Sequence, residues 1–308
     1  MSIEYKTKPR PVRLYSWSAV LFFIFLFSFS LLTHSAFAAD TPWNAKNLEK
    51  IQSLHAASGR SETFSFAVVG DTQGPNSKFP RVLPKILSED GLLFVFDLGD
   101  LVNYATEAEY EDTFFRHVRH LDLPFVTCAS NHDHFKSKRA ANYSRLFGAP
   151  HYYSFKIANV SFIALDNGQD YSMTEEQLEW FERELKSSKD SALRFVMMHR
   201  PLRDPRPNRK RTHDMNENDP NKKEAYARAE AKIARVSSLF DAYKVTMVFT
   251  GHIHSFYEGR WGGTPYIITG GGGGGLYDKG TPASFHHYIR VDVSNGAARY
   301  KVVKVAKP

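Results

Sequence analysis

Acidic, amide and imidazole side chains recur in this sequence directly after short apolar runs. The members of this set are Asp71, Asp100, Asn131, His132, Asp133, His199, His252 and His254. Carboxylate and amide oxygens mixed with imidazole nitrogens suit divalent cations such as Mn, Zn, Fe or Ni better than they suit metals that prefer thiolates. If the fold brings these groups together, a pair of divalent cations would offset the cost of concentrating so many polar groups.

The runs that precede these residues predict how they are positioned. They are apolar throughout rather than alternating, which is typical of strands buried on both faces. They cover residues 64–71, 92–100, 123–133, 193–199 and 245–254. Amphipathic stretches at 78–89, 106–120, 174–187 and 222–242 lie between them and predict helices. Strand–helix alternation indicates an α/β fold, whose ligands collect at the carboxyl ends of the strands.

A second class of segments alternates between apolar and polar residues and predicts antiparallel strands. These segments are 152–157, 160–165, 264–269, 286–293 and 298–305. Both classes fit an α/β fold with two mixed β-sheets packed as a central sandwich and flanked by helices. Thr174, followed by Gln177, predicts a capping box at the start of the third helix.

The N-terminus has the features of an export signal. Four basic residues precede the apolar run 17–32, and Ala36-Phe37-Ala38 provides small residues for cleavage. The alternative is an uncleaved membrane anchor, but the run of 16 residues falls just below the usual length of a spanning helix. We therefore expect residues 1–38 to be a cleaved signal peptide, 39–61 a surface lead-in and 62–308 a single domain. The expected location is periplasmic or secreted, with membrane contact only through the signal.

Charge and cysteine content limit the functional classes. The net charge is +7 and falls to +4 without residues 1–38, since four Lys or Arg and one Glu are removed. This mild excess suits anionic substrates, but it is too small to indicate specific binding of nucleic acid. Cys128 is the only cysteine and lies in an apolar run, so we expect a buried thiol and no intramolecular disulfide.

The ordered motifs resemble those of the calcineurin-like metallophosphoesterase superfamily, which includes purple acid phosphatases, protein phosphatases and cyclic-nucleotide phosphodiesterases. The resemblance covers residues 66–290, and any one motif alone would be weak, because Asp and Asn are common in turns. The matching motifs are Gly70-Asp71-Thr72-Gln73, Gly99-Asp100, Ser130-Asn131-His132-Asp133, His199 and Gly251-His252-Ile253-His254.

The resemblance implies a four-layer fold, two metal ions (Mn, Zn or Fe) and a metal-activated water as the nucleophile. It implies that Asp100 bridges the ions and that Asp71 and His254 bind the first. The second ion would take Asn131, His199 and His252. His132 would stabilise the transition state or protonate the leaving oxygen, and Asp133 would orient His132 by accepting its second N–H.

Two positions depart from the family pattern. Gln73 stands where the family commonly has a histidine, so the first metal is expected to bind more loosely, with Gln73 as a weaker ligand. Asn103 stands where purple acid phosphatases have a metal-binding tyrosine, so no tyrosinate colour is expected.

Several alternatives stay open from the sequence. The substrate would be a phosphorylated small molecule, a nucleotide or a lipid headgroup, and the enzyme a phosphomonoesterase or a phosphodiesterase. A non-catalytic, metal-stabilised anion-binding protein of the envelope is the alternative from another class.

The basic residues that follow His199 are expected either to clamp an anionic substrate or to lie in a solvated loop. They are Arg203, Arg206, Arg209, Lys210 and Arg211. Gly270 to Gly275 is expected to pack near the site rather than to form a P-loop.

Overall fold

The computed structural model describes residues 41–74, 76–134, 140–169, 173–206 and 223–306. The chain divides into a leading unit, Met1–Thr41, and a second unit, Pro42–Pro308, which carries every described helix and strand. The predicted signal segment and its cleavage site lie outside the described residues. Among the residues that are described, no helix is both long and apolar enough to cross a membrane.

Two mixed β-sheets form the centre of the second unit. The five-stranded sheet has the order β11-β10-β1-β2-β3, and the six-stranded sheet has the order β4-β5-β6-β7-β9-β8. The first contains β1 (Phe64–Val69), β2 (Leu92–Asp97), β3 (Phe125–Thr127), β10 (His287–Ser294) and β11 (Ala297–Lys304). The second contains β4 (Tyr153–Ile157), β5 (Val160–Leu165), β6 (Leu193–Met198), β7 (Met247–Thr250), β8 (Phe256–Trp261) and β9 (Thr264–Thr269).

The strands that precede the predicted ligands run parallel within each sheet. β1, β2 and β3 are parallel neighbours, and so are β5, β6 and β7. Antiparallel strands complete the sheets at the β10–β11, β4 and β8 edges. The expected α/β architecture of two mixed sheets is therefore confirmed.

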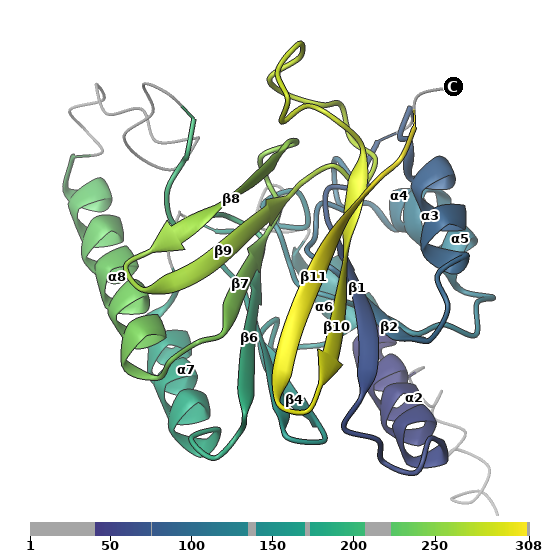
Figure 1. Ribbon diagram of the computed structural model, residues 1–308. Coiled ribbons are helices and arrows are strands. Elements are labelled where there is room, and N and C mark those ends of the chain that lie inside the picture. Colours follow the sequence, from purple (N-terminus) through teal and green to yellow (C-terminus); the bar gives the residue numbers. More distant parts are fainter. Residues whose placement is uncertain (1–40, 75, 135–139, 170–172, 207–222, 307–308) are drawn as a thin grey trace, which may run out of the picture. The chain divides into compact units, whose positions relative to one another are not determined.

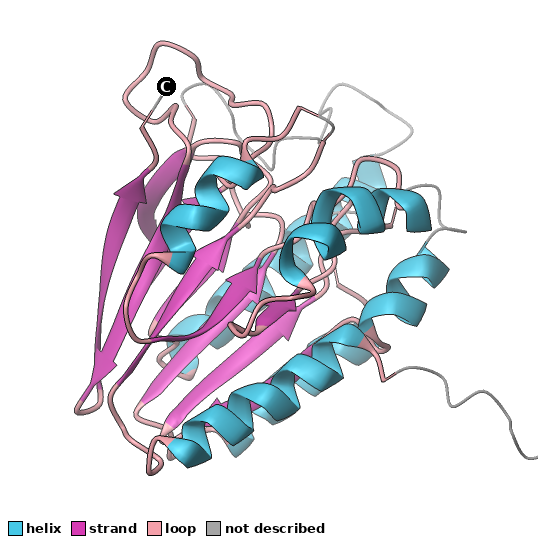
Figure 2. Ribbon diagram, turned by 90° about the vertical axis from the view of Figure 1, so that its right-hand side faces the viewer, coloured by secondary structure: helices cyan, strands magenta, loops and turns pink. Residues whose placement is uncertain are grey.

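Apolar side chains fill three layers around these sheets. Between the sheets, Phe66 stacks on Phe94 with centroids 5.1 Å apart and packs edge-on against Phe162 and Phe195 of the other sheet. Helices α7 (Glu175–Ser187) and α8 (Lys223–Ala242) cover the outer face of the six-stranded sheet. The outer face of the five-stranded sheet is covered by α3 (Phe79–Leu87), η1 (Tyr110–Phe115) and α6 (Ala140–Phe147). Figures 1 and 2 show the resulting order helix, sheet, sheet, helix.

One helix occupies the segment expected to be a lead-in. α2 (Trp43–Ala57) lies along the edge strand β3, where Asn44 donates to the Thr127 oxygen and accepts from the Thr127 N–H, both at 3.0 Å. Asn47 accepts from the N–H of Phe125 at 3.1 Å. These amides pair with the open edge of the sheet as a further strand would. The helix was not predicted, because its buried face is partly polar.

Smaller differences concern single elements. Strand β8 and helix α6 were not predicted, and the segment expected as one helix at 106–120 is divided into α4 (Glu107–Glu109), the π-helix η1 and α5 (Arg116–Val118). Thr174 caps α7 as expected, accepting from the Gln177 N–H at 3.1 Å. The Gln177 side chain, however, bonds to the main chain of Asp166 and does not complete a capping box.

Candidate metal centre

Ligand-capable atoms from both sheets converge at the carboxyl ends of the parallel strands. Asp71, Asp100 and His254 bring such atoms within 4.8 Å of one another, and so do Asp100, His199 and His252. All five residues are buried, and Asp100 belongs to both groups. The arrangement therefore consists of two overlapping groups of candidate metal ligands that share one carboxylate.

The tautomers of two histidines are fixed by main-chain acceptors. The Nδ1 atom of His199 lies 2.9 Å from the Leu98 oxygen, and that of His254 lies 2.8 Å from the Gly275 oxygen. Each Nδ1 must carry the proton that it donates, so in the neutral ring Nε2 has the free lone pair. Those Nε2 atoms lie 3.3 Å from Asp100 Oδ1 and 3.2 Å from Asp71 Oδ1. A metal-binding histidine usually donates one ring N–H to a carbonyl or carboxylate and binds the ion through its other nitrogen, and these two rings can do the same.

Electrostatics in this cluster favours positive charge. Burial alone would lower the pKa of His254, but the Asp71 carboxylate outweighs burial and raises it to about 9. Burial alone would raise the pKa of Asp100, but His199 outweighs it and holds that pKa well below its ordinary value. A cation between these groups would take the place of the protons that they otherwise retain.

Two amide oxygens supply an independent test of whether these residues fit metal ions. Gln73 Oε1 and Asn131 Oδ1 are buried and have no hydrogen-bond partner among the described residues. An unsatisfied buried acceptor costs about 1–3 kcal/mol. The main-chain N–H of Gln73 donates to the main-chain oxygen of Asp100 at 3.0 Å, so Gln73 lies beside the residue that both ligand groups share. Oxygen acceptors left open at the edge of a carboxylate–imidazole cluster fit hard or borderline cations.

Three residues of the cluster have left-handed backbone conformations. The φ angles of Asp71, Asp100 and His252 are 60°, 54° and 68°. Such conformations cost about 1–3 kcal/mol each and persist where the surroundings determine them. Here both Asp71 carboxylate oxygens accept from the His252 N–H, at 3.0 and 2.9 Å. A Cβ on Gly251 would lie 2.5 Å from Asp71 Oδ2, so this close approach requires glycine.

His132 lies at the rim of the cluster, with 34% of its side chain exposed. Its Nδ1 atom is 2.8 Å from the Asn103 main-chain oxygen, and its Nε2 atom is 3.9 Å from Asp100 Oδ2. The ring can therefore donate through Nδ1 to a fixed carbonyl and present Nε2 to a group bound at the centre.

The expected role of Asp133 as the residue that orients His132 is wrong. Asp133 is buried, and its carboxylate accepts from the Tyr110 hydroxyl at 2.7 Å and from the Ser130 hydroxyl at 2.6 Å. Burial raises the pKa of Asp133 to about 6. Its side chain turns into the protein and stabilises the turn, whereas the Asn103 carbonyl makes the bond expected of Asp133. No side-chain signal in the sequence could identify a main-chain oxygen for this role.

The glycine run packs against the site as expected. The Gly274 N–H donates to the main-chain oxygen of Asp71 at 2.7 Å, and the Gly272 N–H donates to the main-chain oxygen of Gly70 at 2.9 Å. A Cβ on Gly274 would lie 2.9 Å from the His254 ring. The run thus holds the turn after β1 with main-chain bonds, and at Gly272 and Gly274 the close approach leaves no room for side chains.

In the described part of the basic segment, Arg203 lies away from the cluster and Arg206 lies near it. Arg203 bonds to Glu230 of α8 at 3.0 Å and does not face the cluster. Arg206 pairs with Asp204 at 2.7 Å and lies 5.9 Å from the Tyr277 ring centroid. Tyr277 in turn stacks on His254 with centroids 4.4 Å apart, a neighbour that the motifs do not indicate. Arg209, Lys210 and Arg211 lie outside the described residues.

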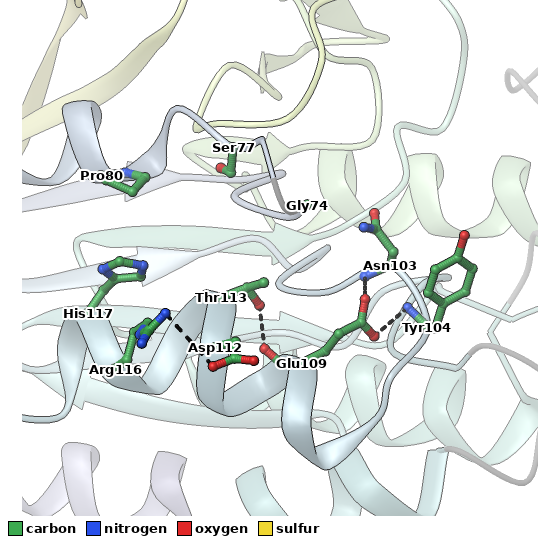
Figure 3. A pocket seen from close by; sticks show the side chains of 10 residues that line it. All are labelled: Gly74, Ser77, Pro80, Asn103, Tyr104, Glu109, Asp112, Thr113, Arg116 and His117. Carbon is green, nitrogen blue, oxygen red and sulfur yellow. Dashed lines mark hydrogen bonds and ion pairs between the residues drawn. The ribbon is translucent and has the colours of Figure 1, made fainter.

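Two cavities open beside the cluster. One of about 280 Å³ is lined by Gln73, Lys78 and His286 among others. The other, of about 620 Å³, extends to Arg116 and His117. They share three lining residues, Gly74, Ser77 and Asn103. Figure 3 shows Asn103 and Tyr104 at one end of the larger cavity and His117 at the other; Glu109 accepts from the N–H groups of Asn103 and Tyr104.

The two-sheet α/β core gathers buried carboxylates and imidazoles at its strand ends, an arrangement that suits a metal-dependent hydrolase. Residues 64–256 match the sequence model of the calcineurin-like phosphoesterase family. The chain therefore belongs to this family, as its motifs predicted.

Individual relatives agree with this assignment. Purple acid phosphatase 21 of Arabidopsis thaliana is 26% identical over 212 residues, which are 62% of this chain and 44% of that protein. The chain thus spans less than half the length of this relative. Two solved structures share the fold. Purple acid phosphatase PPD1 from yellow lupin (Lupinus luteus) seeds has a TM-score of 0.59 at 16% identity, covering 79% of this chain and 52% of that one. GAP50, the anchor in the inner membrane complex of Plasmodium, has a TM-score of 0.58 at 14% identity, covering 80% and 85%.

Proposed function

We propose that this protein hydrolyses phosphoesters at a binuclear metal centre. The observation that carries the proposal is the pair of ligand groups that share Asp100. Asp71, His254 and Gln73 would hold the first ion, with Gln73 the weakest of these ligands. The second ion would take Asn131, His199 and His252. A pair of bound cations would lower the pKa of a water so that it attacks phosphorus at neutral pH, and would hold the phosphoryl oxygens.

The protein's own contribution to proton transfer would come from His132. Its Nδ1–H is directed at the Asn103 carbonyl, which leaves Nε2 as the atom that exchanges a proton with the leaving oxygen. Because this ring is part exposed and is held on a main-chain acceptor, it can meet a bound ester without moving the metal ligands. Asn103 is thus a positioning residue, acting through its main-chain oxygen.

The leaving group of the ester would occupy the cavities beside the centre. The smaller cavity includes the proposed ligand Gln73, and the larger one continues from it past Asn103. Tyr104, whose side chain is exposed, offers an aromatic surface, and Lys78 offers positive charge, whereas Arg116 is paired with Asp112 of the same cavity. This space suits a leaving group larger than a simple alkyl chain, in either a monoester or a diester.

Parallel assays with p-nitrophenyl phosphate and bis-p-nitrophenyl phosphate test the proposal. The chelated protein is reloaded with Mn, Zn or Fe and both substrates are offered to each form. We expect metal-dependent turnover of at least one substrate, and the preferred substrate separates a phosphomonoesterase from a phosphodiesterase. Metal-loaded protein that is inert towards every phosphoester would instead support a non-catalytic anion-binding role.

We further propose that the protein is exported and acts in the periplasm or outside the cell. The basic residues, apolar run and small-residue site at 1–38 support this proposal. Mass analysis of the exported protein should find a start near Ala39 or Asp40. An intact Met1 on protein recovered from the membrane would favour an anchor.

A further inference from the structure

A second cluster of ligand-capable side chains lies outside the set around Asp100. His134, His151 and Asp166 bring one ligand atom each within 4.8 Å of one another. The His134 Nε2 atom lies 2.7 Å from Asp166 Oδ2, and the His151 Nδ1 atom lies 3.1 Å from the same oxygen. Two imidazoles from separate segments therefore converge on one carboxylate oxygen at the end of β5.

Each member of this cluster is held from behind by another polar group. Gln169 lies 2.9 Å from the second ring nitrogen of His134, and the Ser144 hydroxyl lies 2.6 Å from that of His151. The Gly168 N–H donates to the other Asp166 oxygen at 3.0 Å. Ligands of a metal ion characteristically have such outer partners, which fix the ring orientation and the tautomer.

Ser144 and Gln169 can also support a metal-bound state, because each can act as a hydrogen-bond donor or as an acceptor. A hydroxyl donates or accepts, and an amide side chain presents either its oxygen or its nitrogen after a half-turn. Ser144 and Gln169 can therefore accept the ring N–H that remains when Nδ1 of His151 and Nε2 of His134 bind a cation. The same contacts that support a hydrogen-bonded network would support a coordinated ion.

The dimensions and charge of the cluster also fit a bound divalent cation. Ligand bonds of about 2.0–2.1 Å in tetrahedral geometry separate donor atoms by roughly 3.3 Å. The two nitrogen-to-oxygen distances here are 2.7 and 3.1 Å, so a small outward shift of the rings would admit an ion. His134 is almost fully buried, whereas His151 and Asp166 each keep 14% of their side chains exposed, so water can reach the site. Burial alone would raise the pKa of Asp166, but hydrogen bonds from both histidines hold it below its ordinary range.

We propose that His134, His151 and Asp166 form a further divalent-cation site, with water completing a tetrahedral shell. Two histidines and a carboxylate with one open position suit zinc. The loop that follows Asp166 packs directly on the motif that carries Asn131 and His132, since a Cβ on Gly168 would lie 2.5 Å from the Ser130 carbonyl. A bound ion would fasten that motif to the end of β5.

Zinc content per chain tests the site directly. Wild type, His151→Gln, Asp166→Asn and His120→Gln are dialysed against buffered zinc and analysed by mass spectrometry of the metal. We expect His151→Gln to hold one equivalent less than wild type and Asp166→Asn to need at least about tenfold more zinc. His120→Gln, the same exchange at an exposed histidine outside the cluster, should match wild type. Equal zinc content in wild type and His151→Gln would overturn the proposal.

A second measurement separates this site from the centre around Asp100. In an Asp100→Asn background, where that centre is weakened, zinc at the further site should persist and should be lost when His151→Gln is added. At a hundredfold excess of zinc over its Kd, the site should raise the Tm by roughly 5 °C more with His151 present than without it. An identical zinc-dependent rise in both proteins would show a hydrogen-bonded network only. Hydrolytic activity does not enter either readout.

Discussion

The imidazole of His132 is held by the main-chain oxygen of Asn103, with 2.8 Å between Nδ1 and O. Asp133, the adjacent carboxylate, faces the opposite way and bonds to Tyr110 and Ser130. The ring orientation therefore depends on the turn after β2, which also carries Asp100. One loop thus places both the carboxylate that the two candidate ligand groups share and the partner of the proposed proton donor.

Replacing His132 should separate catalysis from metal binding. His132→Gln is expected to lower kcat by roughly 10²–10⁴-fold, because the leaving oxygen loses its proton donor. Metal content should not change. The loss should be larger for an alkyl phosphoester than for a p-nitrophenyl ester, whose leaving group needs no proton. Steady-state kinetics with both ester types check this, and equal losses for the two would contradict the assigned role.

A methyl group at Gly251 should disturb the metal ligands. Gly251→Ala places a Cβ 2.5 Å from Asp71 Oδ2, so the carboxylate must move. We expect a loss of about 100-fold in activity, as is typical for displacement of a catalytic group by about 1 Å. Gly263→Ala is the matched control, because a Cβ there approaches only Asp241, outside the cluster, and no closer than 3.2 Å. Similar activities of the two variants would argue against the Asp71 geometry.

Gln73 should set the affinity of the first metal position. Gln73→His provides the imidazole that is usual in the family and should tighten binding, whereas Gln73→Ala should weaken it by at least about tenfold. Titration of chelated protein with zinc or manganese measures both. If all three proteins bind metal equally, Gln73 is not a ligand.

Acid should destabilise the protein through His287. This ring is buried, and burial lowers its pKa to about 4, against an ordinary value of 6.5. The folded state resists protonation, so its stability is full above pH 6.5 and falls as the pH drops towards 4. Between pH 7 and pH 5 the loss is about 2 kcal/mol.

Denaturant unfolding at these two pH values measures the effect. His287→Gln should have a smaller pH dependence than wild type by this amount, while His120→Gln should retain the wild-type dependence. An unchanged pH dependence in His287→Gln would show that another group is responsible.

The parts of this structure that could be predicted are those with a local signature. Uniformly apolar runs ending in Asp or His indicated β1, β2 and β7, and the motif order indicated the family. Helix α2 was not predicted, because Asn44 and Asn47 pair with the edge of a sheet and such polar residues indicate an exposed helix face in the sequence. The role of the Asn103 carbonyl was not predicted either, because every residue has a main-chain carbonyl and the sequence does not single one out. The cluster of His134, His151 and Asp166 was not predicted, because its residues come from three segments that are brought together only in the tertiary structure.

In the proposed function, Asp100 joins two metal positions at a phosphoester-hydrolysing centre. The most direct test compares turnover of the preferred p-nitrophenyl ester and bound metal per chain in wild type and Asp100→Asn, purified and loaded in parallel. We expect Asp100→Asn to stay folded by circular dichroism, to lose metal from the centre and to fall by at least about 10³-fold in kcat/KM. Full turnover with an undiminished metal content in Asp100→Asn would contradict the proposed function.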